Sequence, residues 1–273
     1  MLVAHRVKEW IEPLLYRTLA FNPDTVIRGM VACWDVDRFL QTAAHKPPEF
    51  FAKAVRNVLF SRIDESKIIE VLTLCPNIEK LSLLLVGEFG EPLDSLAAVF
   101  NPLSPSQIFC ATQDLVQMTR DFEYCVPAFA FLTHLEVLGG YEQDDDEGPE
   151  EAQEFLMTLP QLTHLCFSGG MILHEDICRN LLEALPIRIQ TFVWSAQESH
   201  DLPAELLDDV RFVVIYPPDS TDADWQRGCL NGRNFWTAAD EWVALRRAGT
   251  VQHCFSYLQN GEEREGEEED DDE

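Results

Sequence analysis

A short pattern of apolar and polar positions, apolar-x-x-apolar-x-apolar, recurs along the chain. It is clearest in LTHLEV (132–137) and LTHLCF (162–167), where the tetrapeptide Leu-Thr-His-Leu appears twice. The same pattern fits VRNVLF (55–60), IEKLSL (78–83) and IQTFVW (189–194), with partial copies near Ile108 and Phe212. Short apolar runs bounded by polar residues are typical of strands, so we predict a strand at each copy.

The spacing of these copies is regular. Their middle apolar residues are separated by intervals of 20 to 30 residues, and they are Val58, Leu81, Ile108, Leu135, Leu165, Phe192 and Phe212. Leucine-rich repeats have periods of about 20–29 residues. Between the strands lie segments with helical apolar spacing, among them 66–77 and 151–161, which end near Pro or Asn. Each unit is therefore predicted to be a helix, a tight turn and a short strand.

Such units cannot bury their apolar faces alone, so they are expected to stack. We predict an α/β, leucine-rich-repeat-like curved solenoid over residues 51–216, with parallel strands on the concave side, helices behind them and a cap at each end. An ordinary doubly wound α/β domain also alternates helices and strands. The regular spacing and the lack of a glycine-rich phosphate loop favour the solenoid.

Both ends of the chain carry apolar stripes suited to capping. In the segment 217–258 we expect a loop and then a helix that ends at Gly249, with one apolar face formed by Phe235, Trp236, Ala239, Trp242 and Val243. Residues 1–50 are predicted to form the N-terminal helical cap. Its buried face would consist of Trp10, Ile11, Leu14 and Leu15, with a kink or break at Pro13.

One row of strand positions is predicted to lie on the concave face. It holds Leu59, Ser82, Phe109, Glu136, Cys166, Val193 and Val213, which lie between the apolar positions that point toward the helices. Four of the seven are clearly apolar, which is more than a solvated face requires. We expect a surface that binds a protein or peptide. The alternative is that the N-terminal helix, the acidic loop or the C-terminal segment covers this face.

The doubled Leu-Thr-His-Leu raises the question of a metal site. Residues two apart share one face of a strand, so His134 lies with Glu136 and His164 with Cys166. If the two strands are neighbours, these four side chains form a possible zinc set. A flat strand face rarely allows tetrahedral convergence, and a polar ladder of side chains is the alternative that we favour. No cofactor is expected, because no established catalytic motif occurs in the sequence.

Charge is distributed unevenly along the 273 residues, which carry a formal net charge of −28. Acidic runs occupy the loop 142–154 and the tail 259–273, and self-repelling runs of this kind predict a solvated loop and a disordered tail. A decoy role toward basic partners is the functional alternative for them. The negative charge argues against nucleic acid as a partner, because phosphate contacts need clustered Lys and Arg.

The eight cysteines are scattered among apolar neighbours without a Cys-x-x-Cys pair, which favours a reducing compartment over a disulfide scaffold. No apolar run is long enough for a membrane span, and no signal peptide is apparent. We therefore expect a cytoplasmic or nuclear protein without a membrane partner.

Several stretches resemble a known family. VKEWIEPLLYRTL, VLTLCPNIEKLSL, the two LTHL strands, DVRFVVIYPP and NFWTAADEW are similar to sequences of F-box and leucine-rich-repeat-like proteins of mushroom-forming (basidiomycete) fungi. The resemblance implies a substrate receptor whose F-box recruits a ubiquitin-ligase adaptor, here through Trp10, Ile11, Leu14 and Leu15, while the repeats hold a protein target. The leucine-proline half of the F-box, which precedes the tryptophan in that family, is missing from this sequence.

The leading functional expectation is therefore a non-enzymatic protein–protein interaction module, related to F-box substrate receptors. A scaffold or decoy protein with no ubiquitin-ligase link is the first alternative. A metal-dependent enzyme without a recognisable motif is the second.

Overall fold

A computed structural model gives the fold of the chain. It describes residues 2–21, 33–84, 98–111, 128–139, 154–168, 179–180, 182–183, 188–195, 204–216 and 221–257. The predictions for the acidic tail 259–273, and for the acidic loop apart from Glu154, lie outside these ranges.

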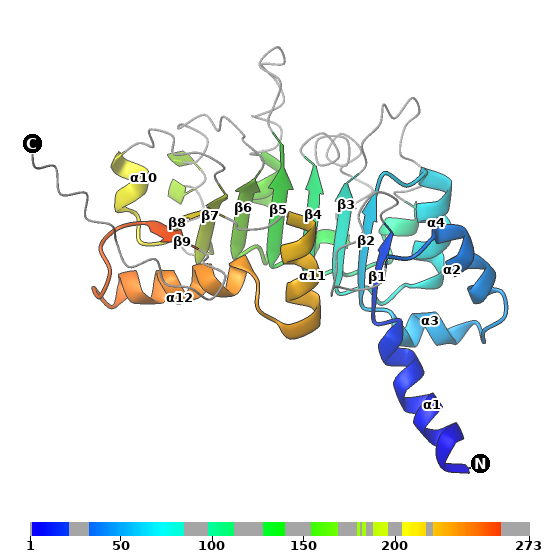
Figure 1. Ribbon diagram of the computed structural model, residues 1–273. Coiled ribbons are helices and arrows are strands. Elements are labelled where there is room, and N and C mark those ends of the chain that lie inside the picture. The colour runs from blue at the N-terminus through cyan, green and yellow to red at the C-terminus, as the bar shows by residue number, and fades with distance from the viewer. Residues whose placement is uncertain are drawn as a thin grey trace, which may run out of the picture.

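The described strands form a single sheet of nine parallel strands in sequence order (Figure 1). They are β1 (Thr18–Phe21), β2 (Asn57–Ser61), β3 (Lys80–Leu84), β4 (Gln107–Ala111), β5 (His134–Leu138), β6 (His164–Ser168), β7 (Thr191–Ser195), β8 (Phe212–Tyr216) and β9 (Phe255–Tyr257). Each strand pairs with the next one along the chain, as in a solenoid and unlike a doubly wound sheet. The predicted α/β leucine-rich-repeat-like solenoid is confirmed.

The predicted repeat positions align in register. The middle apolar residues form one continuous row of paired positions across β2 to β8: Val58, Leu81, Ile108, Leu135, Leu165, Phe192 and Phe212. The sequence pattern missed β1 and β9, the two ends of the sheet. Because β1 starts at Thr18, the sheet begins inside the segment 1–50 that was predicted to be a helical cap.

A ladder of backbone hydrogen bonds joins the units just before each strand. The carbonyl oxygen of Ser106 accepts from the amides of Thr133 and His134 at 2.9 and 3.1 Å, and that of Thr133 accepts from Thr163 and His164 at 3.0 and 2.9 Å. The same two-to-one arrangement occurs at four further carbonyls, those of Arg17, Arg56, Glu79 and Thr163. This ladder sets the register of each strand against its neighbour.

Hydroxyl groups strengthen the ladder at three units. Ser106 Oγ donates to the carbonyl of Glu79 at 3.1 Å, Thr133 Oγ1 to that of Ser106 at 2.9 Å, and Thr163 Oγ1 to that of Thr133 at 3.1 Å. The threonine of Leu-Thr-His-Leu therefore links successive units, while its two leucines enter the core. The tetrapeptide Leu-Thr-His-Leu therefore recurs because each copy makes the same link and fills the same core positions.

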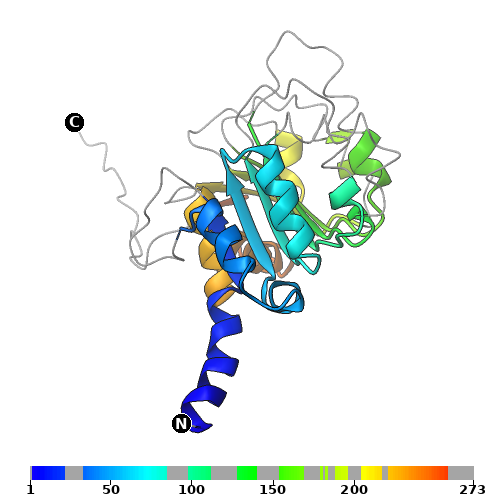
Figure 2. The same cartoon turned by 90° about the vertical axis from the view of Figure 1, so that its right-hand side faces the viewer.

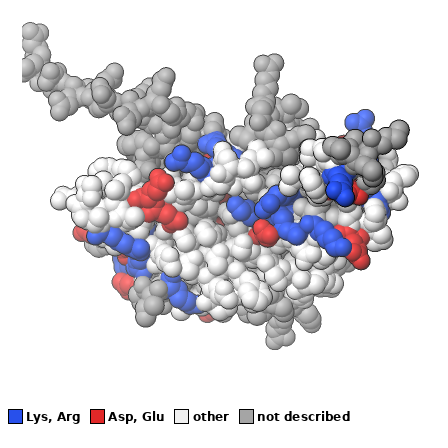
Figure 3. Space-filling model, turned by 90° about the horizontal axis from the view of Figure 1, so that it is seen from below, with Lys and Arg blue, Asp and Glu red and all other residues white. Residues whose placement is uncertain are grey.

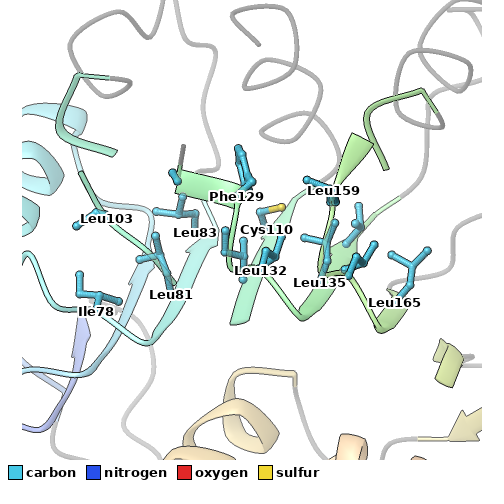
Figure 4. Close-up of a cluster of buried hydrophobic side chains, with 14 of the residues drawn as sticks. Ile78, Leu81, Leu83, Leu103, Cys110, Phe129, Leu132, Leu135, Leu159 and Leu165 are labelled. Atoms are coloured by element: carbon cyan, nitrogen blue, oxygen red, sulfur yellow. The ribbon is translucent and has the colours of Figure 1, made fainter. Parts of the chain in front are cut away.

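The main hydrophobic core lies between the sheet and the helices on one side, which we call the outer face. These helices include α2 (Val36–Ala43), α3 (Glu49–Ala54), α4 (Glu65–Leu74) and α10 (Ala204–Asp208). In Figure 4, Leu81 of β3, Leu135 of β5 and Leu165 of β6 point into this core together with Phe129. The helices behind the strands thus lie where the solenoid prediction placed them.

Two further helices, α11 (Thr221–Asn231) and α12 (Phe235–Arg247), lie against the other face of the sheet, the inner face (Figures 1 and 2). A loop was predicted where α11 is found. Asn234 caps the amino end of α12 by accepting from the amide of Thr237 at 3.4 Å. At the other end, Arg246 donates to the carbonyls of Asp209 and Phe212 at 2.7 and 2.6 Å, which fixes α12 to β8.

Gly228 brings α11 close to this cap. A Cβ atom at this glycine would lie 2.7 Å from Nδ2 and 2.9 Å from Cβ of Asn234. We predict that Gly228→Ala destabilises the fold by roughly 1–3 kcal/mol, because the clash displaces the capping residue. Urea denaturation followed by circular dichroism measures the change.

Gly232→Asn is the matched control for that substitution. Gly232 has φ +76°, and a Cβ atom there meets no heavy atom within 4 Å. Asn tolerates this backbone conformation, so the control should lose well under about 1 kcal/mol. Equal stability of Gly228→Ala and the unaltered chain would show that α11 does not pack against the cap.

Candidate functional site

The seven residues predicted to form a binding surface do share one row on the inner face. Leu59, Ser82, Phe109, Glu136, Cys166, Val193 and Val213 occupy paired positions on β2 to β8. All seven are buried, with exposures of 3% or less. The prediction that this row is an open protein-binding surface is therefore wrong.

The C-terminal segment covers the row, as one alternative proposed. Over β1 to β4, Trp225 of α11 packs in a cluster with Ala20, Leu59, Leu84 and Phe109. Over β6 to β8, α12 covers Cys166, Val193, Val213 and Ile215 with the side chains of Phe235, Trp236, Ala239 and Val243. The aromatic stripe predicted to cap the last repeat thus lies on the inner face instead.

The two histidines of Leu-Thr-His-Leu stack on each other at the amino ends of β5 and β6. Their ring centroids are 4.0 Å apart with an interplanar angle of 9°, and Trp236 contacts both rings edge-on. His164 Nε2 lies 3.0 Å from Oδ1 of Asp240, which also accepts from Thr191 Oγ1 at 2.7 Å. Burial lowers the pKa of His134 to about 3, and the charge of the neighbouring His164 acts in the same direction. The pair thus forms a polar seam against α12.

The zinc hypothesis finds no support in this geometry. Within the described ranges no group of three or more His, Cys, Asp or Glu side chains is placed to hold a metal ion. Nδ1 of His134 and of His164 contacts the hydroxyl of the preceding threonine. Glu136 and Cys166 lie in the next row along the strands, and burial raises the pKa of the Cys166 thiol. The four residues therefore serve as a polar and packing ladder.

A buried carboxyl group lies under α11 at the centre of the inner face. Glu136 accepts a hydrogen bond from Ser168 Oγ at 3.2 Å. Burial, together with the charge of Asp224, raises the pKa of Glu136 to about 8. Asp224 is itself buried and accepts from the amide of Phe235 at 3.1 Å. Asp224 lies in a segment that was predicted to be a loop, so the pattern of the chain could not indicate that these two acids lie near each other.

Among the described residues, five of the ten exposed large apolar side chains lie on one helix, α1 (Leu2–Leu15). Trp10, Ile11, Leu14 and Leu15 are 69, 48, 63 and 65% exposed. The expectation that these side chains form the buried face of a cap is wrong. Val7, which the sequence analysis did not select, continues the same stripe and is 40% exposed.

The carboxyl end of α1 is anchored to the body, and the rest of the helix projects away from it (Figures 1 and 2). Glu12 forms an ion pair with Lys46. Tyr16, just beyond the helix, stacks on Trp34 with a centroid distance of 5.3 Å and meets Phe51 edge-on at 5.2 Å. The apolar stripe is thus held in a fixed direction from the body.

Charges are mixed on the side of the molecule seen from below (Figure 3). Basic and acidic side chains alternate there between wide uncharged areas. Several arginines are also engaged with the backbone: Arg188 donates to the carbonyls of Leu159 and Met157, and Arg211 to that of Leu182. These contacts serve the turns between units.

None of the helices in the described ranges is long and apolar enough to cross a membrane.

No protein-family model and no curated protein matches the chain. Among solved structures, the chain is similar to the leucine-rich repeat-containing protein LegL7 from Legionella pneumophila. The two share 13% sequence identity over 78% of this chain and 85% of LegL7, with a TM-score of 0.39. So weak a likeness carries no functional argument, and the fold assignment rests on strand order and register.

Phe109 tests the closure of the inner face. We predict that Phe109→Asp unfolds the chain or lowers its stability by roughly 3–5 kcal/mol, because it buries an unpaired carboxylate and leaves a cavity. Phe131→Asp is the control, since Phe131 is 55% exposed, and it should change stability by less than about 0.5 kcal/mol. Thermal unfolding compares the two, and a stable Phe109→Asp variant would mean that the inner face is open.

Glu136 makes stability depend on pH. Its pKa in the folded chain, about 8, lies above its ordinary value of 4.5. The folded state therefore holds this proton more tightly than the unfolded state, and stability falls as pH rises from about 4.5 to 8. We predict that Glu136→Gln removes this loss and stabilises the chain at pH 9 by roughly 2–4 kcal/mol.

Urea denaturation at pH 5, 7 and 9 measures the effect of that substitution. Glu241→Gln, at an exposed carboxyl on α12, is the control and should follow the unaltered chain at every pH. If Glu136→Gln also follows the unaltered chain, Glu136 is ionised in the folded state.

Proposed function

We propose that this protein is a protein–protein interaction module that binds its partner through the apolar stripe of α1, formed by Val7, Trp10, Ile11, Leu14 and Leu15. The observation that carries the proposal is the exposure of this stripe. The inner face, which solenoid proteins commonly use for binding, is instead covered by the chain's own C-terminal helices. Contiguous exposed apolar side chains mark interaction sites more often than scattered ones do.

The stripe has the geometry of a helix that docks into an apolar groove. Its residues follow helical spacing, so they lie along one side of a helix about 21 Å long. Helices recognised in grooves use anchors at i, i+3, i+4 and i+7. Trp10 at the middle of the stripe is the residue type that most often dominates binding energy.

The anchoring of α1 supports the same proposal. Because the Glu12–Lys46 ion pair and the packing of Tyr16 fix the base of the helix, less conformational freedom is lost when a partner binds. The F-box resemblance of the same residues suggests the partner: the adaptor of a ubiquitin ligase, with the chain acting as a substrate receptor. A scaffold role without a ligase would use the same stripe with a different protein.

Affinity purification of the tagged chain from cells of its source organism tests the proposal. We predict that adaptor and cullin co-purify with the unaltered chain and that Trp10→Asp or Leu14→Asp reduces their recovery at least tenfold. Leu230→Asp, at an apolar residue of α11 with 56% exposure, is the matched control and should leave recovery unchanged.

Two results would contradict parts of the proposal. Recovery of another protein, lost in the same two α1 variants, would retain the interaction module and reject the ligase link. Identical partners for the unaltered chain and both α1 variants would reject α1 as the binding surface.

A further inference from the structure

The apolar stripe of α1 is bordered by basic side chains on both sides. Each residue of a helix is rotated by about 100° from the one before it. The five apolar side chains therefore span an arc of about 140°, from Trp10 at one border to Leu15 at the other. Arg6 lies about 40° beyond Trp10, and Lys8 lies about 20° beyond Leu15. Both basic residues are exposed, so the stripe is an apolar band between two positive flanks.

The acidic residues of the same helix lie on its opposite side. Glu9 lies opposite the middle of the stripe, and Glu12 lies between Glu9 and Lys8 around the helix. Glu12 forms the ion pair with Lys46 of the body. The acidic side of α1 is therefore tied to the body, and the side that a partner can reach carries apolar and basic side chains. Arg17, exposed just beyond the helix, adds a positive charge at its base.

These charges are not arranged to stabilise the helix itself. A helix gains stability from acidic residues in its first turn, and α1 has none there. Lys8 precedes Glu12 by one turn, which is the weaker order for an ion pair within a helix. The positive flanks would gain most from the carboxylates of a partner that lie along both borders of the stripe.

We propose that the partner of α1 is a protein with an apolar groove and acidic residues along both rims, so that its carboxylates meet Arg6 and Lys8 while the stripe fills the groove. This inference rests on the proposed function, because it names the chemistry of the protein that α1 binds. It applies to a ligase adaptor and to any other protein partner alike.

Charge complementarity favours such a groove over two other occupants. A second copy of α1 would offer basic rather than acidic flanks to the stripe. An anionic membrane would face the whole chain, whose formal net charge is −28, and would repel it. A groove with acidic rims contacts α1 alone, where the reachable charges are positive.

Reversal of the charges on the two flanks tests the proposal. In affinity purification of the tagged full chain, the protein that is lost in Trp10→Asp should be recovered at least tenfold less from the double variant Arg6→Glu with Lys8→Glu. The double variant Arg38→Glu with Arg233→Glu is the matched control. It makes the same change of net charge at exposed residues of α2 and of the turn before α12, and it should leave recovery unchanged.

Salt distinguishes charged docking from purely apolar docking. Raising NaCl from about 0.05 M to about 0.5 M shortens the range of charge interactions about threefold. Apolar contacts do not depend on this screening. Recovery of the same protein should fall at least tenfold over this range. Recovery that stays unchanged at high salt, or in the charge-reversed variant, would overturn the acidic rims.

Cross-linking locates the contact. A carbodiimide joins Nζ of Lys8 to a carboxylate of the partner as an amide, and the water that is lost converts the carbodiimide to a urea. We expect peptides in which Lys8 is joined to Asp or Glu of the recovered protein. Lys8→Arg keeps the charge, so it should retain binding and lose these peptides. Their absence from a sample that contains the partner would place Lys8 away from it and overturn the proposal.

The outcomes separate this proposal from the proposed function. If Trp10→Asp loses no protein, both fall. If Trp10→Asp loses a protein that the charge-reversed variant keeps, only the acidic rims fall. The purified chain should sediment as a monomer and should not bind vesicles of phosphatidylcholine and phosphatidylserine in equal amounts. Dimers or vesicle binding that Trp10→Asp abolishes would overturn the groove in favour of a second copy or a membrane.

Discussion

The structure depends on the ladder of carbonyl oxygens at the junctions before the strands. Each of these oxygens accepts two amide hydrogens from the following unit, and at three units a Ser or Thr hydroxyl donates to the same position. Parallel strands would otherwise slip along one another, and a slip of one residue exchanges the two faces of a sheet. By fixing the register, the ladder places one row of apolar side chains against the outer helices and the next row on the inner face.

The inner face is closed because the register places a row of apolar side chains on it. Leu59, Phe109 and Val193 form a row too apolar to remain in water, and the aromatic side chains of α11 and α12 cover it. The surface that repeat proteins commonly use for binding is consequently part of this protein's own core. Within the described residues, α1 instead carries a stripe of five exposed apolar side chains, and this helix is fixed at its base and projects from the body.

Much of the fold could be read from the pattern of the chain, and the candidate site could not. The apolar spacing identified seven strands and their register, because each unit repeats the same local requirements for a turn, a strand and a buried stripe. The strands β1 and β9 were not predicted, because they are short and lack that pattern. The apolar row and the apolar C-terminal stripe were both recognised, yet their contact was not, since two apolar surfaces do not reveal from sequence which of them pair.

The sequence by itself determined the repeat: the positions of the strands, the residues of each row and the separation of the chain into helix–turn–strand units. These follow from interactions between residues that are close along the chain or one unit apart. Only the tertiary structure decided which surfaces are accessible. Trp225 reaches a cluster with Ala20, about two hundred residues earlier, whereas Trp10 finds no covering surface in the described chain. Burial is a property of the whole arrangement, because an apolar side chain leaves water only where another surface of matching shape meets it.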